Sequence, residues 1–362
     1  MRRLGISVYP EHSTPEADRA YLERAAAHGF TRIFTCLLSV DKGAEETVEE
    51  FGSFISYAHD LGFMVAVDTN ETVFERLGAT PFDIAPFAKM GVDIIRLDSH
   101  FGDRGNIVLT RNPYGIGIEF NASHNHPLAN LIERGANAKN MVACHNFYPE
   151  PYTGLCEEYS ERYSKIYKDL SMPLAAFVSS QQPDTFGPWP VFAGLPTCED
   201  DRHRPIDLQV RHVIASGLVD DVIIGNCFAS EDELAAMAAV DLTRVRCRID
   251  LDEGISEAER EIVFDFDHAA RHDPSPYMIR SSWSRSSFRE RQIAPRAFDA
   301  PVFTKGDVLV VNDNMAHYRG EIQIATRDIP NDGVRNRVGR IPEEEQFLLD
   351  YILPEHPFGF IR

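Results

Sequence analysis

Residues 91–123 read GVDIIRLDSHFGDRGNIVLTRNPYGIGIEFNAS, and this stretch decides the predicted fold. It holds two short apolar runs, IIRL and GIGI, which are followed directly by Asp98 and by Glu119. Short runs that are rich in Ile and bounded by glycine are typical of buried parallel strands. Because α/β barrels place their chemistry where the strands end, both acids are predicted to face one site. The local pattern equally allows either acid to cap a loop or to pair with Arg96.

The same pattern recurs along the first two thirds of the chain, where strand-like runs alternate with helical segments. One helix begins at Thr14-Pro15-Glu16, an N-cap followed by proline, and stops at His28-Gly29. The alternation predicts an α/β domain over residues 1–243, a TIM-like (β/α)8 barrel. The main alternative is a doubly wound open sheet, but no glycine-rich phosphate motif follows a predicted strand. The eight predicted strands are 4–9, 31–38, 64–67, 94–97, 115–118, 141–145, 173–178 and 221–224.

The pattern changes near residue 245, and residues 244–362 are predicted to form a smaller β-rich domain. Strands are expected at 245–251, 307–311, 321–325 and 338–341, and Pro357-Phe358-Gly359 is expected to be a turn. An arginine-rich segment is interpreted mainly as a solvated loop, since charged loops are usually hydrated. Its arginines are Arg280, Arg285, Arg289, Arg291 and Arg296.

The composition of the chain limits the classes of function that it can have. The chain has 362 residues, a net charge of −20 and six cysteines without a CxxC pair. The charge disfavours a nucleic-acid binder, although a local basic pocket can still take small anions. The scattered cysteines disfavour a zinc ribbon or redox pair and fit a reducing compartment. The N-terminus lacks the long apolar region of a signal peptide, and no run approaches a membrane span, so a cytoplasmic protein without membrane insertion is predicted.

Acidic residues after the predicted strands suit glycosidic cleavage. That reaction needs a carboxylic acid to protonate the leaving oxygen and a second group to stabilise or attack the anomeric carbon. Asp98 and Glu119 are the predicted catalytic pair. Glu119 is the favoured acid because its neighbours Ile118 and Phe120 keep it dry. Two further acids, Glu11 and Asp68, are predicted to bind sugar hydroxyls.

Other polar and aromatic residues are candidates for substrate binding. Asparagines after the predicted strands can recognise hydroxyl or acetamido groups, or can cap loops. Basic residues in the long loop after the seventh strand can bind phosphate or carboxylate, or can pair with Asp200 and Asp201. Exposed aromatics would stack on a sugar, and buried ones would belong to the core. These candidates are Asn121, Asn146 and Asn226; Arg202, His203 and Arg204; and Tyr148, Trp189 and Phe192.

Two other classes of function remain open at this stage. In one, the acids and His145 hold a divalent ion for an aldolase, isomerase or epimerase acting on a sugar phosphate. Neither an HxH nor an HExxH motif is recognised, and neither a metal nor another cofactor is predicted. In the other, the chain is a non-enzymatic binder of sugar phosphates. Loss of activity on chelation would indicate the first, and binding without turnover would indicate the second.

Several stretches carry a resemblance to one family. They include LGISVYPE, VDIIRLDSHFG, HNFYPEPYTGL and GPWPVFAGLPTCEDDRHR in the first domain, and IRSSWSR and KGDVLVVNDNMAHYRGEIQI in the second. The chain resembles the 6-phospho-N-acetylmuramidases of bacterial cell-wall recycling. The resemblance implies a TIM-like barrel followed by a cyclophilin-like β-barrel domain. It also implies hydrolysis of 6-phospho-N-acetylmuramyl-β-1,4-N-acetylglucosamine to N-acetylmuramic acid 6-phosphate and N-acetylglucosamine, without a cofactor.

The implied substrate carries a phosphate and a lactyl carboxylate, and both need cationic partners. The barrel offers Arg202, His203 and Arg204 for this role. The second domain offers Arg280, Arg285 and Arg319 as cations, and Asn314, Tyr318 and Gln323 from its family-like stretch. One departure from the family pattern is Asn226, which follows a glycine where an acid is expected. The 2-acetamido group of the substrate also permits a substrate-assisted route.

Overall fold

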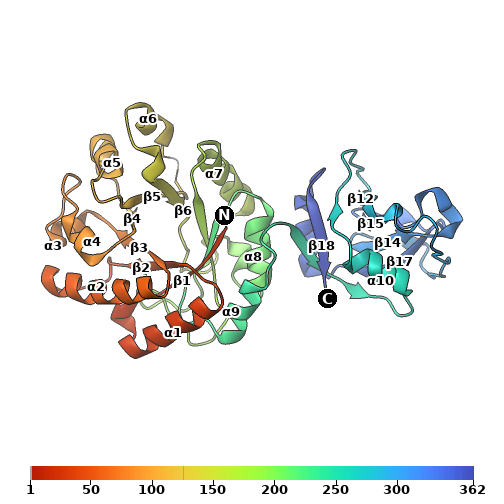
Figure 1. The fold of residues 1–362 in the computed structure, drawn as a ribbon, viewed down its shortest axis with the longest axis horizontal. Helices are drawn as coiled ribbons and strands as arrows, with labels where there is room; N and C mark the ends of the chain where they lie inside the picture. Colours follow the sequence, from red (N-terminus) through yellow and green to blue (C-terminus); the bar gives the residue numbers. More distant parts are fainter. Residues whose placement is uncertain (1, 125) are drawn as a thin grey trace. The chain divides into compact units, whose positions relative to one another are not determined.

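The computed structural model describes residues 2–124 and 126–362, which form two compact units, Met1–Val240 and Asp241–Arg362. The first unit is a closed barrel of eight parallel strands in sequence order, β1 to β8, in which β8 also pairs with β1 (Figure 1). Helices alternate with these strands along the chain. The predicted TIM-like barrel is therefore confirmed.

The strands of the barrel are β1 Arg3–Ser7, β2 Arg32–Cys36, β3 Met64–Thr69, β4 Ile94–Leu97, β5 Gly117–Asn121, β6 Met141–Cys144, β7 Leu174–Val178 and β8 Asp221–Ile224. The α-helices are α1 Pro15–Ala27, α2 Ala44–Asp60, α3 Glu71–Leu77, α4 Ala85–Met90, α5 Gly102–Thr110, α6 Leu128–Glu133, α7 Glu157–Asp169, α8 Ile206–Ala215 and α9 Glu231–Ala238. Short 3-10 helices are η1 Pro10–His12, η2 Ala138–Asn140 and η3 Glu199–Asp201.

Local sequence explains where these elements begin and how they pack. The Thr14 side chain accepts a hydrogen bond from the Ala17 amide, so α1 starts as predicted. Ser230 and Glu233 form a reciprocal capping box at the start of α9. Every residue of β2 and of β7 is buried, as expected for strands covered on both faces.

Strand β5 differs from the prediction. It spans Gly117–Asn121, so Glu119 lies in the middle of the strand and does not follow its end. Asp98, in contrast, directly follows β4 as predicted. The apolar run ended at Glu119 only because that side chain is charged. The backbone pairing continues through Asn121, which lies opposite Cys144 of β6.

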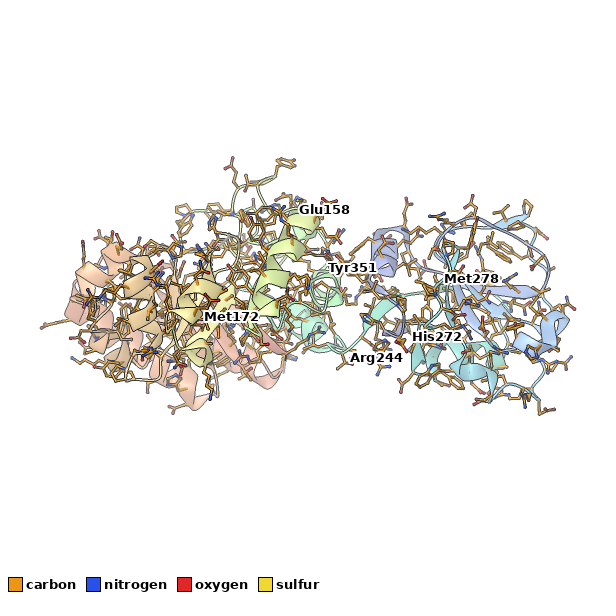
Figure 2. All side chains as sticks on the ribbon, turned by 90° about the horizontal axis from the view of Figure 1, so that it is seen from above. Glu158, Met172, Arg244, His272, Met278 and Tyr351 are labelled. Carbon is orange, nitrogen blue, oxygen red and sulfur yellow. The ribbon has the colours of Figure 1, made fainter. Side chains whose placement is uncertain are left out.

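The second unit is mostly β-structure, and a cyclophilin-like barrel remains a prediction for it. It contains a five-stranded sheet in the order β10-β17-β14-β15-β12, a three-stranded sheet β11-β18-β9 and a pair β13-β16. The predicted turn at 357–359 is wrong, because those residues lie in β18 and pair with β9 and β11. Arg280 lies in β12, which begins at Met278 (Figure 2), and not in a loop.

The elements of the second unit are β9 Val245–Arg248, β10 Asp250–Leu251, α10 Glu257–Phe264, β11 His268–Ala269, β12 Met278–Ser281, η4 Trp283–Arg285, β13 Val302–Phe303, β14 Asp307–Val311, η5 Asp313–Tyr318, β15 Ile322–Ala325, β16 Ile329–Pro330, β17 Arg335–Arg340, η6 Glu343–Tyr351 and β18 Pro357–Ile361. Within the described part of the chain, every helix is too short or too polar to span a bilayer.

Candidate active site

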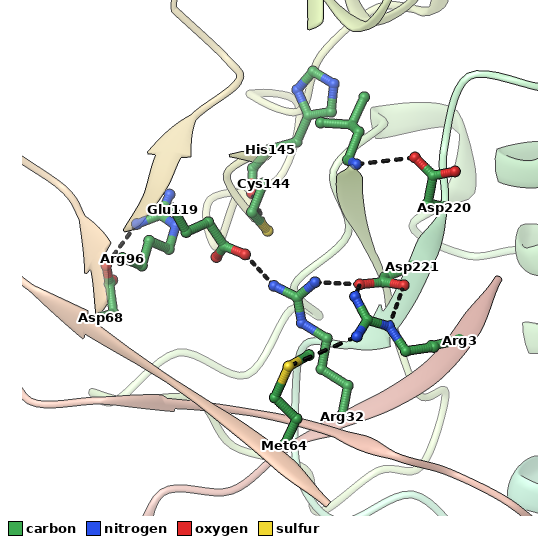
Figure 3. Close-up of polar contacts among 11 residues, drawn as sticks. Arg3, Arg32, Met64, Asp68, Arg96, Glu119, Cys144, His145, Asp220 and Asp221 are labelled. Carbon is green, nitrogen blue, oxygen red and sulfur yellow. Dashed lines mark hydrogen bonds and ion pairs between the residues drawn. The ribbon is translucent and has the colours of Figure 1, made fainter. Parts of the chain in front are cut away.

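A buried network of charged side chains runs through the barrel (Figure 3). Arg32 of β2 bonds to Glu119 of β5 and to Asp221 of β8. Arg3 also binds Asp221, at 2.7 and 2.9 Å. Strands β2 and β5 are not neighbours in the sheet, so the contact between Arg32 and Glu119 crosses the barrel interior. Burial alone would lower the pKa of Arg32, but Glu119 and Asp221 raise it overall, so the guanidinium stays charged.

This network changes the interpretation of Glu119. The residue has no exposed surface, and within the described residues its Oε1 atom has no hydrogen-bond partner. Its burial comes from the barrel interior and not from Ile118 and Phe120, because adjacent side chains in a strand point to opposite faces of the sheet. A carboxyl without accessible surface cannot pass a proton directly to a glycosidic oxygen, so we assign Glu119 to the interior network and not to the role of general acid.

A second cluster lies nearer the carboxyl ends of the strands, around Arg96 of β4. Its Nη1 atom lies 2.6 Å from Oδ1 of Asp68 and 3.7 Å from Oδ1 of Asp98. Its Nη2 atom donates to Oδ1 of Asn146, which lies beyond β6. Arg96 is buried, whereas the side chain of Asp98 is 46% exposed. One guanidinium therefore holds two carboxylates in different environments.

Asp68 has the chemistry of a general acid. It is the fifth residue of β3, and its side chain is only 5% exposed. Burial raises its pKa to about 6, and this outweighs the opposing effect of Arg96; the nearby Asp98 and Glu119 raise the pKa further. A carboxyl that titrates close to neutral pH can hold a proton and then donate it.

Glu11 lies in η1, on the segment that follows the carboxyl end of β1. Ser39 donates to its Oε1 atom, and burial raises its pKa while that hydrogen bond lowers it. Within the described residues, its Oε2 atom is buried without a hydrogen-bond partner. Cys36, at the end of β2, experiences the charges of both Glu11 and Asp68, which places the three side chains in one neighbourhood.

Three polar residues predicted near the site have structural partners instead. The Asn226 amide is buried and bonds to Ser180 and Thr185. These hydrogen bonds hold the loop after β7 in place. Asn121 is buried, and its oxygen accepts from the Ser123 amide. The third residue is His145, which was considered as a metal ligand. Its Nε2 atom lies 2.8 Å from the Ser164 hydroxyl on α7, away from the acids.

The basic loop after β7 does not present its arginines as predicted. Arg202 is buried and binds Glu199 through two nitrogens, at 2.6 and 2.7 Å. Its other donors reach the carbonyl oxygens of Ala193 and Glu150, at 3.0 and 3.2 Å. Arg204 pairs with Asp201, at 2.9 Å. His203 is exposed. Of these three residues, only His203 has an exposed side chain that an anion can reach. The guanidinium groups of the other two bind carboxylates within the same loop.

Replacing Arg202 by Met is expected to lower the free energy of unfolding by about 2–3 kcal/mol, because Glu199 and several carbonyls lose charge-assisted partners. Urea denaturation followed by circular dichroism measures this change. Arg104→Met is the control, because its exposed guanidinium lies over the ring of Phe82 at 5.5 Å and should cost less than about 1 kcal/mol. An equal, small loss in both variants would contradict the structural role of Arg202.

The sequence prediction overlooked a histidine cluster. His124-Asn125-His126 is a His-x-His motif, and His100 from the loop after β4 joins it, with its Nε2 atom 3.1 Å from Nε2 of His126. Burial, with the neighbouring histidines, lowers the pKa of His126 to about 4. The described residues hold no group of three or more His, Cys, Asp or Glu side chains placed to bind a metal ion.

Arg96 was also missed as a site residue, although the sequence carried a signal for it. Residues two apart in a strand lie on the same face, so Arg96 must share a face with Asp98 if the strand continues that far. Register pairing then places Arg96 beside Asp68 of β3 and Glu119 of β5. The local pattern showed that Arg96 and Asp98 lie together, but it did not show that Asp68 also binds Arg96.

The predicted residues of the second unit fall into two groups. Arg280 and Gln323 are register partners on β12 and β15, and the ring of Tyr318 lies against the Arg285 guanidinium. Asn314 lies in η5 together with Tyr318, and Arg319 directly follows η5, but both make other contacts. The Asn314 amide group donates to the Gly333 carbonyl, and Arg319 pairs with Asp313 at 2.5 Å.

Two family models match nearly the whole chain. The model described as 6-phospho-N-acetylmuramidase, N-terminal, matches residues 4–239, and its C-terminal counterpart matches residues 245–361. The chain belongs to the 6-phospho-N-acetylmuramidase family. It is therefore a glycoside hydrolase, and the family name implies a phosphorylated sugar as substrate.

Solved structures of similar proteins extend over both units. An uncharacterized B. cereus protein is 38% identical, with a TM-score of 0.91, and the match covers 100% of this chain and 99% of that one. A conserved protein of unknown function from Enterococcus faecalis is 24% identical, with a TM-score of 0.69 and coverage of 99% and 96%, and it shows the shared fold alone. No curated protein matches the sequence.

Proposed function

We propose that this member of the 6-phospho-N-acetylmuramidase family cleaves 6-phospho-N-acetylmuramyl-β-1,4-N-acetylglucosamine during cell-wall recycling, releasing N-acetylmuramic acid 6-phosphate and N-acetylglucosamine. The observation that carries this proposal is the Arg96 cluster. Asp68 and Asp98 approach the same Nη1 atom, one buried with a raised pKa and the other exposed. Glycosidic hydrolysis needs two carboxyl groups whose environments differ in this way.

Asp68 is proposed to protonate the glycosidic oxygen. Asp98 then stabilises the anomeric carbon, either by direct attack or by orienting the 2-acetamido group. The Oδ1 atoms of the two groups lie 2.6 and 3.7 Å from the same Nη1 atom, so both carboxyl groups can reach one substrate bound at this rim.

Other rim residues are proposed to bind the disaccharide. Glu11 and Asn146 offer oxygens to sugar hydroxyls, and the half-buried Tyr148, which follows β6 near Arg96, offers a hydroxyl. The loop after β7 exposes Trp189 and Phe192, the latter by 70%, and aromatic rings exposed to this degree suit stacking on a sugar face. Asn121, Asn226, Arg202 and Arg204 are proposed to shape the rim through the contacts described above.

The test is direct turnover. The purified chain is incubated with the phosphorylated disaccharide, and release of N-acetylglucosamine is followed by chromatography and mass spectrometry. Cleavage of this compound, with much slower cleavage of the unphosphorylated disaccharide, is the expected result. Cleavage of neither compound, or equal rates on both, would refute the proposed substrate.

The pH dependence follows from the assignment of Asp68 as the acid. Its pKa of about 6 means that the required protonated form dominates below that pH and falls about tenfold per unit above it. We expect kcat/KM to decline on the alkaline side with a midpoint near pH 6. Rates on the disaccharide measured between pH 4.5 and 8.5 test this, with unfolding midpoints measured across the same range as the control. A rate that rises through pH 6 would exclude Asp68 as the acid.

A further inference from the structure

Four arginines of the second unit gather on one face of its main sheet. This arginine face consists of Arg271, Arg280, Arg285 and Arg335 around Glu321 and Gln323. Arg280 of β12 is the register partner of Gln323 on β15, so their side chains project on the same side of the sheet. Glu321 lies two residues before Gln323 and shares that side. The face joins two stretches, IRSSWSR and GEIQI, that lie far apart in sequence.

The floor of the arginine face is a connected set of polar side chains. The Arg335 Nε atom donates to Oε1 of Gln323 at 2.8 Å, and Nε2 of Gln323 donates to Oε1 of Glu321 at 2.9 Å. Arg285 completes the set with its Nη1 atom 3.4 Å from Glu321. Glu321 and Gln323 are 1% and 5% exposed. These contacts hold the carboxylate and the amide in place, so the floor presents a fixed set of polar groups beneath the arginines.

The rim is cationic and partly open. Arg271 and Arg280 share one partner, Asp273, while Arg285 pairs with Glu321 and Arg335 pairs with Asp332. Four guanidinium groups thus face three carboxylates, on a chain whose net charge is −20. The side chains of the first three arginines are 23–26% exposed, so their outer edges reach solvent.

Aromatic rings adjoin these arginines. The Arg285 guanidinium lies 4.5 Å from the ring centre of Tyr318, which is 40% exposed, and Trp283 is 64% exposed. Guanidinium forks bind carboxylate or phosphate, amide and carboxylate groups bind hydroxyls, and exposed rings cover the apolar face of a sugar. Together these groups match an acidic sugar better than a neutral sugar or a simple anion.

We propose that the arginine face is a binding site for the anionic substituent of an acidic amino sugar, a carboxylate or a phosphate. The identity of the sugar rests on the proposed function, whereas the site itself rests on the contacts above. The anion displaces Asp273 from one of its two arginines, and the sugar ring lies toward Tyr318.

Calorimetric titration of the full chain with three sugars tests the proposal. N-acetylmuramic acid carries the lactyl carboxylate alone, N-acetylglucosamine 6-phosphate carries the phosphate alone, and N-acetylglucosamine carries neither. At least one acidic sugar is expected to bind about tenfold more tightly than the neutral one, and the tighter of the two identifies the anion. Equal binding of all three would overturn the proposal.

Variants locate the binding. Combining Arg280→Met with Arg285→Met should remove the preference for the acidic sugar. Arg291→Met is the matched control, because it also pairs with a carboxylate, Glu261 on α10, but lies outside the arginine face. If the double variant unfolds, Arg285→Lys keeps the charge, loses the fork and should weaken binding several-fold.

Unchanged preference in either test variant would refute the site. Since titration requires no turnover, a chain that fails to cleave the disaccharide would refute the proposed function while leaving this test intact.

Discussion

Asp68→Asn is expected to lower kcat on the phosphorylated disaccharide by about 10²- to 10⁴-fold, the usual contribution of a positioned acid. The amide keeps an oxygen that can accept from Arg96, so the cluster and the fold should persist. What the variant loses is the proton that Asp68 holds because burial raises its pKa to about 6. Steady-state rates on the disaccharide measure the effect, and an unchanged unfolding midpoint shows that the fold is intact.

An aryl glycoside with an acidic phenol as leaving group separates this role from a structural one. That bond breaks without protonation of the leaving oxygen, so Asp68→Asn should retain most of its activity on it. Asp98→Asn should lose activity on both substrates, because its role at the anomeric carbon does not depend on the leaving group. Equal losses on the two substrates in Asp68→Asn would remove Asp68 as the acid.

The second large effect concerns stability. Arg32→Met is expected to lower the free energy of unfolding by about 3–5 kcal/mol, because it leaves the buried Glu119 without its partner. The buried Asp221 keeps a cationic partner in this variant, since Arg3 still binds it. Urea denaturation of the variant and the parent measures the difference.

Two further variants test the reason for that loss. Adding Glu119→Gln to Arg32→Met should recover a large part of it, because the unpaired buried charge is then removed. Lys165→Met is the surface control, since its pair with Asp169 is exposed and should be worth less than about 1 kcal/mol. A loss of under 1 kcal/mol in Arg32→Met, or no recovery in the double variant, would contradict the buried network.

The barrel could be predicted because its signals are local. Apolar runs, glycine stops and helix caps recur along the chain, and each depends on residues only a few positions apart. Even so, no helix was predicted between the strands at 94–97 and 115–118, where α5 lies, because this segment contains glycines that lower helix propensity. At one of them, Gly105, an added Cβ would lie 2.6 Å from the Cβ of Phe101. Phe101 is the N-cap of the same helix, so the local geometry of the helix start requires glycine at that position.

The site was harder to predict, because the role of each residue depends on partners that are distant in sequence. Asp98 and Glu119 looked equivalent, each an acid after an apolar run. The structure separates them, since β5 continues past Glu119, which then meets Arg32, 87 residues away. From the sequence, Arg202 was predicted to bind phosphate. In the structure, Glu199 and several carbonyl oxygens already bind its guanidinium group.

The sequence by itself determined the order of strands and helices, the family and the set of acids from which the chemistry must come, because period and motif are properties of neighbouring residues. Only the tertiary structure decided which acids are sealed inside the barrel and which surround Arg96. Closing eight strands into a ring brings together side chains that are remote along the chain. Their ionisation is then set by burial and by the charges that they meet there.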